Sequence, residues 1–144
     1  MPIQSPVPYI YKRKLYLSDT DASGIAYHSK FLDWMEAARV EFLTAAYKPQ
    51  TQVIAEDQVT FMPIRVEIDY KSPLLFEDTV EISVFVKSLE KVRILLGYTL
   101  TKAVDQKTIL VANAMVEIVC VDASTKRPQR VPEKIASAIA NWQK

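Results

Sequence analysis

The stretch that decides the fold covers residues 19–28 and reads Asp19-Thr20-Asp21-Ala22-Ser23-Gly24-Ile25-Ala26-Tyr27-His28. It holds two carboxylates, a glycine, a tyrosine and the only histidine of the chain. An apolar-periodic segment, residues 29–47, follows directly and predicts a long helix. A carboxylate can act as base or nucleophile, and the free N–H groups of a helix start can stabilise a developing oxyanion. This order of features indicates a site that acts on a carbonyl group.

Length and composition predict an ordinary globular protein. The 144 residues are 49% hydrophobic and 24% charged, which suits one domain, and we expect it over residues 9–144. The net charge of +1 gives no reason to expect nucleic acid as a partner. No apolar run reaches the roughly 18–20 residues that span a bilayer. Residues 1–8 carry three prolines and no charge, which predicts an extended N-terminal arm rather than a signal peptide. Cys120 is the only cysteine, so we expect a reducing, cytoplasmic location.

The residue counts exclude several kinds of chemistry. The two glycines, Gly24 and Gly97, lie far apart in the chain. A phosphate-binding P-loop, a dinucleotide fingerprint and a serine-hydrolase elbow each need at least two glycines close together. One histidine and one cysteine cannot form the usual zinc sites, whereas a carboxylate-only magnesium site stays open.

Hydrophobic periodicity predicts an α+β fold. Strands are expected over residues 9–17, 61–71, 80–87, 92–102 and 108–121, with a hairpin turn at residues 105–107. Helices are expected over residues 29–47, 51–56 and 130–144, the first with Ser29 as N-cap and ended by Pro49. The order of one strand, one long helix and four strands predicts an antiparallel sheet with a dominant helix on one face. The last strand is apolar on both sides, so we expect self-association by edge pairing or face packing.

Two features of the long helix are read separately. The aromatic and methionine stripe of Phe31, Met35 and Phe42 is predicted to be core. Glu36 and Arg39 are three residues apart and can form a solvated pair, or else shape a pocket. The sequence leaves these alternatives open.

The decisive stretch has a specific form. Asp19-Thr20-Asp21-x-x-Gly24-x-x-Tyr27-His28, followed by Phe31-Leu32-x-x-Met35-Glu36-x-Ala38-Arg39-x-Glu41, resembles the hot-dog-fold thioesterases. The nearest group is the YbgC-like acyl-CoA thioesterases, which are relatives of 4-hydroxybenzoyl-CoA thioesterase. The likeness continues through Ile68-Asp69-Tyr70-Lys71-Ser72-Pro73 and Val119-Cys120-Val121-Asp122, and covers roughly residues 9–138.

The resemblance implies a fold and a reaction. The fold would be a curved antiparallel sheet of about five strands wrapped around one long helix. The protein would be a homodimer or homotetramer with active sites at the subunit interfaces. The reaction would hydrolyse an acyl thioester to a carboxylic acid and a thiol, with no metal or other cofactor, within lipid metabolism. Asp21 would be the catalytic carboxylate. The backbone N–H of His28 would polarise the thioester carbonyl, and its imidazole is a second candidate group.

The remaining site candidates have alternative readings. Asp19 is expected to order the loop through backbone N–H groups, and Gly24 to provide either a backbone angle or room for a ligand. Tyr27 either lines the acyl pocket or packs. Basic residues that could clamp the phosphates of coenzyme A are Arg65, Lys71, Lys91, Arg93, Lys126, Arg127 and Arg130, with a preference for the pair 126–127. Ser72, at the end of a predicted strand, is a further substrate-binding candidate.

The chain departs from the family pattern at two positions. Leu17 stands where the YbgC-like group often has a tyrosine, and Ser23 where glycine is common. Several alternatives therefore remain. Asp21 can be general base or nucleophile, the carrier can be coenzyme A or acyl carrier protein, and an aliphatic acyl group is favoured over an aromatic one. A hot-dog hydratase is disfavoured by the single histidine, and a non-catalytic acyl-thioester-binding protein is the rival that Leu17 supports.

Overall fold

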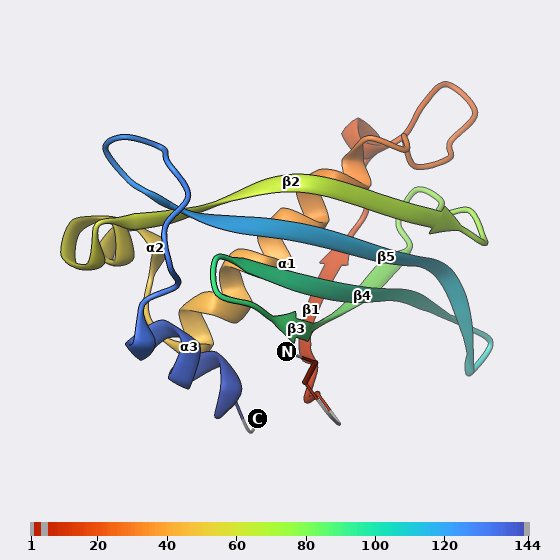
Figure 1. The fold of residues 1–144 in the computed structure, drawn as a ribbon. Helices are drawn as coiled ribbons and strands as arrows, with labels where there is room; N and C mark the ends of the chain where they lie inside the picture. Colours follow the sequence, from red (N-terminus) through yellow and green to blue (C-terminus); the bar gives the residue numbers. More distant parts are fainter. Residues whose placement is uncertain (1, 4–5, 143–144) are drawn as a thin grey trace.

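The computed structural model describes residues 2–3 and 6–142, and it shows a curved antiparallel sheet wrapped around one long helix (Figure 1). The sheet has five strands in the order β1-β3-β4-β5-β2. The strands are β1 (Tyr9–Lys14), β2 (Val59–Tyr70), β3 (Thr79–Leu89), β4 (Arg93–Val104) and β5 (Lys107–Asp122). The predicted α+β class and the number of strands are confirmed.

Three helices accompany the sheet. They are α1 (Lys30–Ala46), the short α2 (Gln50–Gln52) and α3 (Glu133–Ala140). The expected helix over residues 51–56 is divided, because α2 continues into a π-helical turn, Val53–Asp57. The first strand is shorter than predicted, because a 3₁₀ turn over Leu17–Asp19 follows it. None of the helices in the described part of the chain is long and apolar enough to cross a membrane.

The long helix α1 begins where the sequence predicts it, but by different bonds. Ser29 occupies the N-cap position in a helical conformation, and its side chain makes no capping hydrogen bond. The first turn is instead closed by backbone bonds, in which the Lys30 N–H donates to the Tyr27 carbonyl (3.0 Å) and the Phe31 N–H to the His28 carbonyl (3.3 Å). The geometry at the start of α1 therefore depends on residues 27 and 28.

The buried face of α1 is slightly rotated from the predicted one. The predicted stripe of Phe31, Met35 and Phe42 is buried, which confirms that interpretation. Trp34 is buried as well, whereas Leu32, which keeps helical spacing, is 46% exposed. The reason is that the sheet covers the side of α1 that carries Trp34, and Leu32 lies beyond the edge of that contact.

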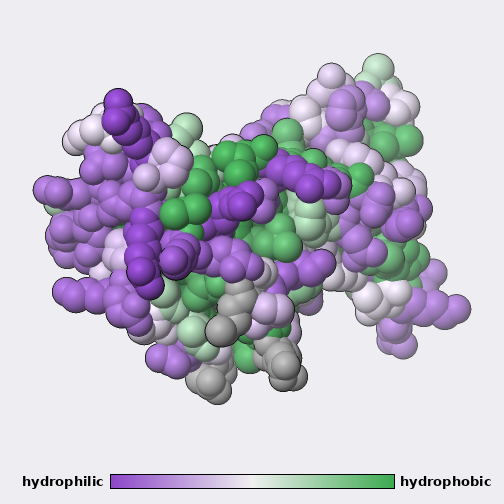
Figure 2. Space-filling view, viewed as in Figure 1, coloured by the Kyte–Doolittle hydropathy of each residue, from purple (hydrophilic) through white to green (hydrophobic). Residues whose placement is uncertain are grey.

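The two faces of the sheet differ in polarity. On β3 the residues Val80, Ile82, Val84 and Val86 face α1 and are buried, as the alternation predicts. The opposite face, which Figure 2 shows, mixes apolar and polar side chains. On it Phe85 of β3 lies directly across from Gly97 of β4. A Cβ on Gly97 would lie 2.5 Å from Cε2 of Phe85, so the ring covers the glycine closely.

The edges of the sheet are β1 and β2, and they differ in length and polarity. β1 has six residues, and Lys12, Arg13 and Lys14 make up half of it. β2 has twelve residues, and Met62, Ile64 and Val66 on it are exposed. The pairing of β2 with β5 shifts between Pro63 and Arg65, so Ile64 lies at a β-bulge.

Several predictions concern the ends of the chain and its turns. In the predicted arm, the Ile3 N–H donates to the Lys87 carbonyl (3.0 Å), while residues 1, 4 and 5 lie outside the described residues. The predicted closing helix is α3, and residues 143–144 of that prediction are likewise outside the described residues. Asp105 and Gln106 both have positive φ, 51° and 65°, as a two-residue hairpin turn requires.

Candidate active site

The decisive loop folds into a small hairpin. The Asp21 N–H donates to the Ile25 carbonyl (2.8 Å), and the Gly24 N–H donates to the Asp21 carbonyl (3.0 Å). Gly24 has a φ of +83°, a conformation that glycine adopts without strain. No atom lies within 4 Å of a Cβ placed on Gly24, so within one chain the backbone conformation, and not lack of space, requires glycine.

A second loop supports this hairpin from the side. The Ala26 N–H donates to the Leu74 carbonyl (2.8 Å), and the Phe76 N–H donates to the Gly24 carbonyl (3.3 Å). Lys102 of β4 fixes the supporting loop, because its Nζ lies 3.0 Å from Oδ2 of Asp78 and 2.7 Å from the Pro73 carbonyl. The position of the hairpin is therefore set by the sheet.

Asp21 lies on the exposed hairpin. Its Oδ1 accepts hydrogen bonds from the Ser23 backbone N–H (2.8 Å) and from the Ser23 hydroxyl. These bonds, the hydroxyl contributing most, hold the pKa of the Asp21 carboxyl below its usual value. The backbone N–H of Ile25 makes a smaller contribution to the same lowering of the pKa. Asp21 is thus an exposed carboxylate whose lowered pKa favours the ionised form.

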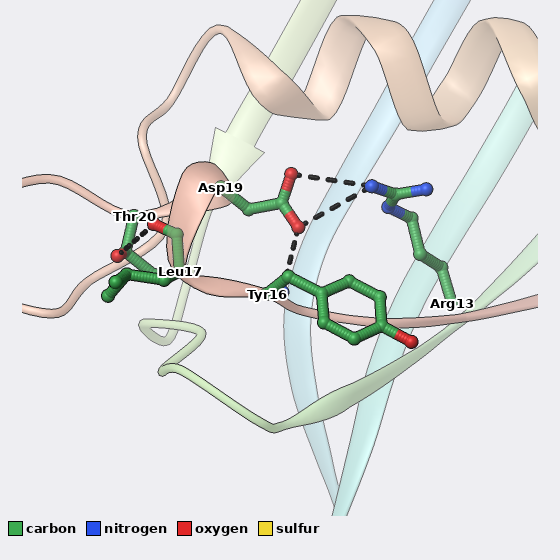
Figure 3. Close-up of polar contacts among 5 residues, drawn as sticks. All are labelled: Arg13, Tyr16, Leu17, Asp19 and Thr20. Carbon is green, nitrogen blue, oxygen red and sulfur yellow. Dashed lines mark hydrogen bonds and ion pairs between the residues drawn. The ribbon is translucent and has the colours of Figure 1, made fainter.

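Asp19 is placed in the opposite way. Its side chain is buried, with 2% of its surface exposed, and its Oδ2 accepts a hydrogen bond from the Tyr16 N–H (2.9 Å). Nη2 of Arg13 lies 3.4 Å from each carboxylate oxygen (Figure 3). The predicted bond to a backbone N–H is present, and sequence reasoning missed Arg13. Leu17 is 69% exposed and Tyr16 is also exposed, so neither side chain is part of the buried pair.

His28 stands at the start of α1 and is exposed. Its imidazole lies against the ring of Tyr27, with 4.7 Å between the ring centroids. Within the part of the chain that the structure describes, neither the His28 N–H nor the Ser29 N–H donates to a protein acceptor. These N–H groups lie at the positive end of the α1 dipole and are free to bind an oxygen atom.

Tyr70 fixes this helix start, and the sequence analysis did not select it. Its hydroxyl donates to the His28 carbonyl (3.1 Å), and its ring meets Phe31 edge-on at 4.9 Å. Burial raises the pKa of the Tyr70 phenol, so it stays a hydrogen-bond donor. The alternation of Val66, Ile68 and Tyr70 on the inner face of β2 is the signal that could have revealed it.

A groove of about 190 Å³ runs between α1 and β2. Its walls are mostly apolar and are formed by Leu32, Met35, Pro63, Val66 and Val116, with Asp33, Glu36 and Arg39 as the charged members. The groove begins one helical turn after His28, which is about 5 Å along the axis. It can therefore receive an apolar group whose reactive end lies at the helix start.

The Glu36–Arg39 pair lines this groove, which agrees with the pocket-shaping alternative of the sequence analysis. The guanidinium of Arg39 lies 3.9 Å from the Glu36 carboxylate, with the Arg39 side chain only 12% exposed. It also donates to the Tyr98 hydroxyl at 3.5 Å. Arg39 is therefore part of the groove wall, and Glu36 is the solvated member of the pair.

The preferred phosphate clamps, Lys126 and Arg127, are not near the loop within one chain, whereas Lys71 directly follows Tyr70, whose hydroxyl donates to the His28 carbonyl. Arg65 lies on the face away from α1 and pairs with Glu67 at 2.5 Å. Lys126 and Arg127 lie in the turn after β5, where the Lys126 ammonium donates to the Ala123 carbonyl. This turn adjoins the start of β2, whereas His28 contacts its end. The twelve residues of β2 separate the two ends by roughly 35–40 Å.

Two further points complete the site. Ser72 follows β2 and is half-buried, and its N–H donates to the Val111 carbonyl (3.1 Å), so only its side chain is available to a ligand. Among the described residues, no group of three or more His, Cys, Asp or Glu side chains is arranged to hold a metal ion.

The comparisons with known proteins agree with this geometry. The chain belongs to the thioesterase-like superfamily, whose family model matches residues 16–139. It is 28% identical to acyl-CoA thioesterase YbgC of Haemophilus influenzae, over 87% of this chain and 89% of that protein. It is 30% identical to the 1,4-dihydroxy-2-naphthoyl-CoA hydrolase of Microcystis aeruginosa, over 87% of this chain and 88% of that protein.

A solved structure confirms the fold. A mutant of 4-hydroxybenzoyl-CoA thioesterase, complexed with 4-hydroxybenzoyl-CoA, superposes with a TM-score of 0.87 over 92% of this chain and 98% of that chain. The identity is 14%, so this likeness concerns the fold alone. Together the comparisons confirm the predicted family, the hot-dog fold and the enzyme class, a thioester hydrolase.

Proposed function

We propose that this protein is an acyl-CoA thioesterase that hydrolyses an acyl thioester to the free acid and the thiol. One observation carries the proposal: the ionised carboxylate of Asp21, the free N–H groups at His28 and an apolar groove all adjoin one short loop. The relatives named for acyl-CoA and 1,4-dihydroxy-2-naphthoyl-CoA hydrolysis support the same reaction.

The start of α1 is the proposed oxyanion site. The thioester carbonyl oxygen accepts a hydrogen bond from the His28 N–H, and the positive end of the helix dipole favours the charge that develops there. The His28 imidazole, exposed beside Tyr27, is the proposed second donor to the same oxygen. The acyl chain extends from this point into the groove along α1.

Asp21 supplies the attacking step by one of two routes. As general base, it takes a proton from water as the oxygen adds to the carbonyl carbon; the C–S bond of the tetrahedral intermediate then breaks, and protonated Asp21 returns the proton to the leaving sulfur, which departs as the thiol. As nucleophile, its carboxylate oxygen displaces the thiolate to form a mixed anhydride, which water then opens. Both routes use the ionised form, and the low pKa of Asp21 agrees with that requirement.

The groove favours an apolar acyl group. Its volume of about 190 Å³ and its apolar walls suit an aliphatic chain, and acyl carrier protein is the alternative carrier. We propose that the reaction needs no metal or other cofactor. Full activity after dialysis against a chelator is the expected result, and loss of activity restored by a divalent cation would contradict it.

A homodimer formed through β2 is the proposed assembly. An exposed apolar edge strand of twelve residues is a template for pairing with another strand. Two-fold pairing of β2 with its copy is antiparallel, so the start of one β2 lies beside the end of the other. The partner's Lys126 and the partner's Arg127 would then lie near His28, where they can bind the phosphates of coenzyme A.

Subunit mixing tests this assembly. Asp21→Asn and the double variant Lys126→Ala/Arg127→Ala are each expected to have low activity alone. A mixed dimer then contains one site with both intact groups, so mixing the two variants should restore part of the wild-type activity. No restoration, with mixed dimers shown by native mass spectrometry, would contradict a clamp supplied by the partner.

Thiol release tests the proposed reaction. We would measure it for acetyl-, hexanoyl-, palmitoyl- and benzoyl-CoA with the wild type and with Asp21→Asn. The matched control is Asp105→Asn, the same change in the exposed turn between β4 and β5. The expected result is turnover that Asp21→Asn removes and Asp105→Asn leaves intact.

A non-catalytic acyl-thioester-binding protein is the second candidate, and the exposed Leu17 is the observation that favours it. Such a protein would bind acyl-CoA in a calorimetric titration. It would release no thiol from thioesters of coenzyme A or of acyl carrier protein.

A further inference from the structure

The guanidinium of Arg13, on β1, is the cationic partner of the buried Asp19 carboxylate. Asp19 is the only charged side chain classed as buried in the described part of the chain. A carboxylate in such a place remains ionised only when its charge is compensated. The compensating groups are the Tyr16 N–H at 2.9 Å and Nη2 of Arg13 at 3.4 Å from both oxygens (Figure 3).

Arg13 is itself held between β1 and the first turns of α1. Its Cζ lies 5.9 Å from the ring centroid of Trp34, within range of a cation–π contact. Its Nε is buried and has no hydrogen-bond partner among the residues that the structure describes. A neutral side chain of similar length would fill this space without an unpaired N–H, so packing alone does not account for an arginine here.

The turn that contains Asp19 is linked to the start of α1 by backbone bonds. The Asp19 carbonyl accepts the Tyr27 N–H (2.9 Å), and the Tyr27 carbonyl accepts the Lys30 N–H (3.0 Å). Thr20 and Ala26 form a bridge across the base of the Asp21 hairpin. A shift of Asp19 therefore moves both His28 and Asp21.

We propose that Arg13 is a positioning residue for thioester hydrolysis, and that its pair with Asp19 sets the orientation of the His28 N–H relative to the Asp21 carboxylate. The inference rests on the proposed function. Arg13 is not a catalytic residue, because Asp19 is buried and Arg13 reaches the loop only through it. A positional error of about 1 Å at a reacting group can lower the rate by about 10²-fold.

The expected signature is a change in kcat without a change in KM. The groove between α1 and β2 is lined by other residues, so substrate binding does not depend on Arg13. Arg13→Met keeps the apolar stem and removes the charge. We expect it to lower kcat by at least about 10-fold and to leave KM within about twofold of the wild-type value.

A conservative variant should restore part of the rate. Both contacts to Asp19 come from one nitrogen of Arg13, Nη2, so the single ammonium group of a lysine can provide the same charge. Arg13→Lys is therefore expected to recover part of the kcat that Arg13→Met loses, while the contact of the guanidinium with Trp34 is lost. A kcat for Arg13→Lys as low as that of Arg13→Met would overturn the role of the charge.

A matched control separates positioning from general destabilisation. Lys48 and Asp57 form a similar ion pair, 3.1 Å long with side chains 19% and 14% exposed, beside the π-helical turn. Lys48→Met removes a partly buried cation in the same way. We expect both methionine variants to melt at lower temperature and only Arg13→Met to lose kcat, with rates measured below both melting temperatures.

A double variant tests whether the two residues act as a unit. Arg13→Met/Asp19→Asn should lose no more kcat than the more impaired single variant, because each change breaks the same pair. Losses that multiply would overturn the inference. Arg13→Gln, which keeps a donor without the charge, replaces the methionine variant if circular dichroism shows that the latter is unfolded.

The outcome for Asp21→Asn separates this inference from the proposed function. If Asp21→Asn leaves turnover unchanged, the proposed function fails. If Asp21→Asn removes turnover while Arg13→Met keeps the wild-type kcat, only the inference about Arg13 fails.

Discussion

Asp19 and Asp21 lie two residues apart in one loop, and the structure places them in opposite surroundings. Asp19 is buried, paired with Arg13, and bonded to the backbone of Tyr16. Asp21 is exposed, and its carboxylate bonds to Ser23 within its own hairpin. The difference shows how one residue type serves two purposes. The buried carboxylate holds the loop in place, and the exposed carboxylate stays available for chemistry.

The largest expected effect separates the two carboxylates by activity. Asp21→Asn should lower kcat by at least about 10²-fold, because the amide can neither accept the proton of water nor attack the thioester. Its melting temperature should fall only slightly, because Asp21 is exposed and its hydrogen bonds are confined to its own hairpin. Steady-state thiol release and a thermal melt on the same sample check this prediction. A large drop in melting temperature would place Asp21 in the framework with Asp19.

The second effect concerns stability. Asp19→Ala leaves Arg13 without its partner and the Tyr16 N–H without an acceptor, so we expect a loss of about 2 kcal/mol in the free energy of unfolding. Chemical denaturation measures it. The control is Glu41→Ala, which removes a carboxylate from an exposed position of α1 and should stay within about 0.5 kcal/mol of the wild type. Equal losses at the two positions would contradict the special role of Asp19.

A smaller effect is expected at the tip of the Asp21 hairpin. Gly24→Ala places a Cβ on a residue with φ of +83°, which costs about 1 kcal/mol of unfolding free energy. Nothing lies within 4 Å of that Cβ, so the cost is conformational and not steric. Gly24→Asn should cost less than Gly24→Ala, because asparagine tolerates left-handed conformations. Denaturation curves that rank asparagine as the worse substitution would contradict this explanation.

The smallest effect is a shift along the pH axis. Ser23→Ala removes the hydrogen bond that contributes most to the low pKa of Asp21, so this pKa should rise toward its usual value. The acid limb of kcat/KM should therefore move to higher pH. A lowered carboxyl pKa also adds stability above the unfolded-state pKa, which is lost as the pH falls through the folded-state pKa. An unchanged acid limb would mean that another group controls it.

Much of the fold could be predicted because its signals are local. The apolar spacing of Phe31, Met35 and Phe42 defines the buried face of α1, and the alternation in β3 defines its buried side. The hairpin turn at Asp105 and Gln106 also depends only on residues near it. The resemblance then supplied the reaction class, through a motif that is continuous in the sequence.

Other features depend on contacts between distant segments. Nothing in β2 itself shows that it pairs with β5 and forms an edge of the sheet. Leu32 and Trp34 both fit a helical pattern, and only the position of the sheet decides that Trp34 is buried and Leu32 is not. Tyr70 reaches His28 across a long stretch of chain, so its contact could not be read from either segment.

The roles of Asp19 and Asp21 could be predicted only in part from the sequence. The motif distinguishes Asp19 from Asp21 by order, but burial distinguishes them physically, and burial follows from the fold. Arg13 illustrates the difficulty, because three basic residues, Lys12, Arg13 and Lys14, stand side by side in β1. Strand alternation points Arg13 toward α1 and its two neighbours away from it, and only the packed structure brings it to Asp19.

The contact between Phe85 and Gly97 bears on how the sheet acquires its alignment during folding. The aromatic ring fits only where the opposite strand has no side chain, and Gly97 is the only such residue in β4. A slip of one residue would set the ring against Leu96 or Tyr98 and would turn the buried side chains of β3 outward. Gly97 therefore favours one pairing register between β3 and β4. The Gly97→Ala variant should fold more slowly, even if its final structure accommodates the methyl group.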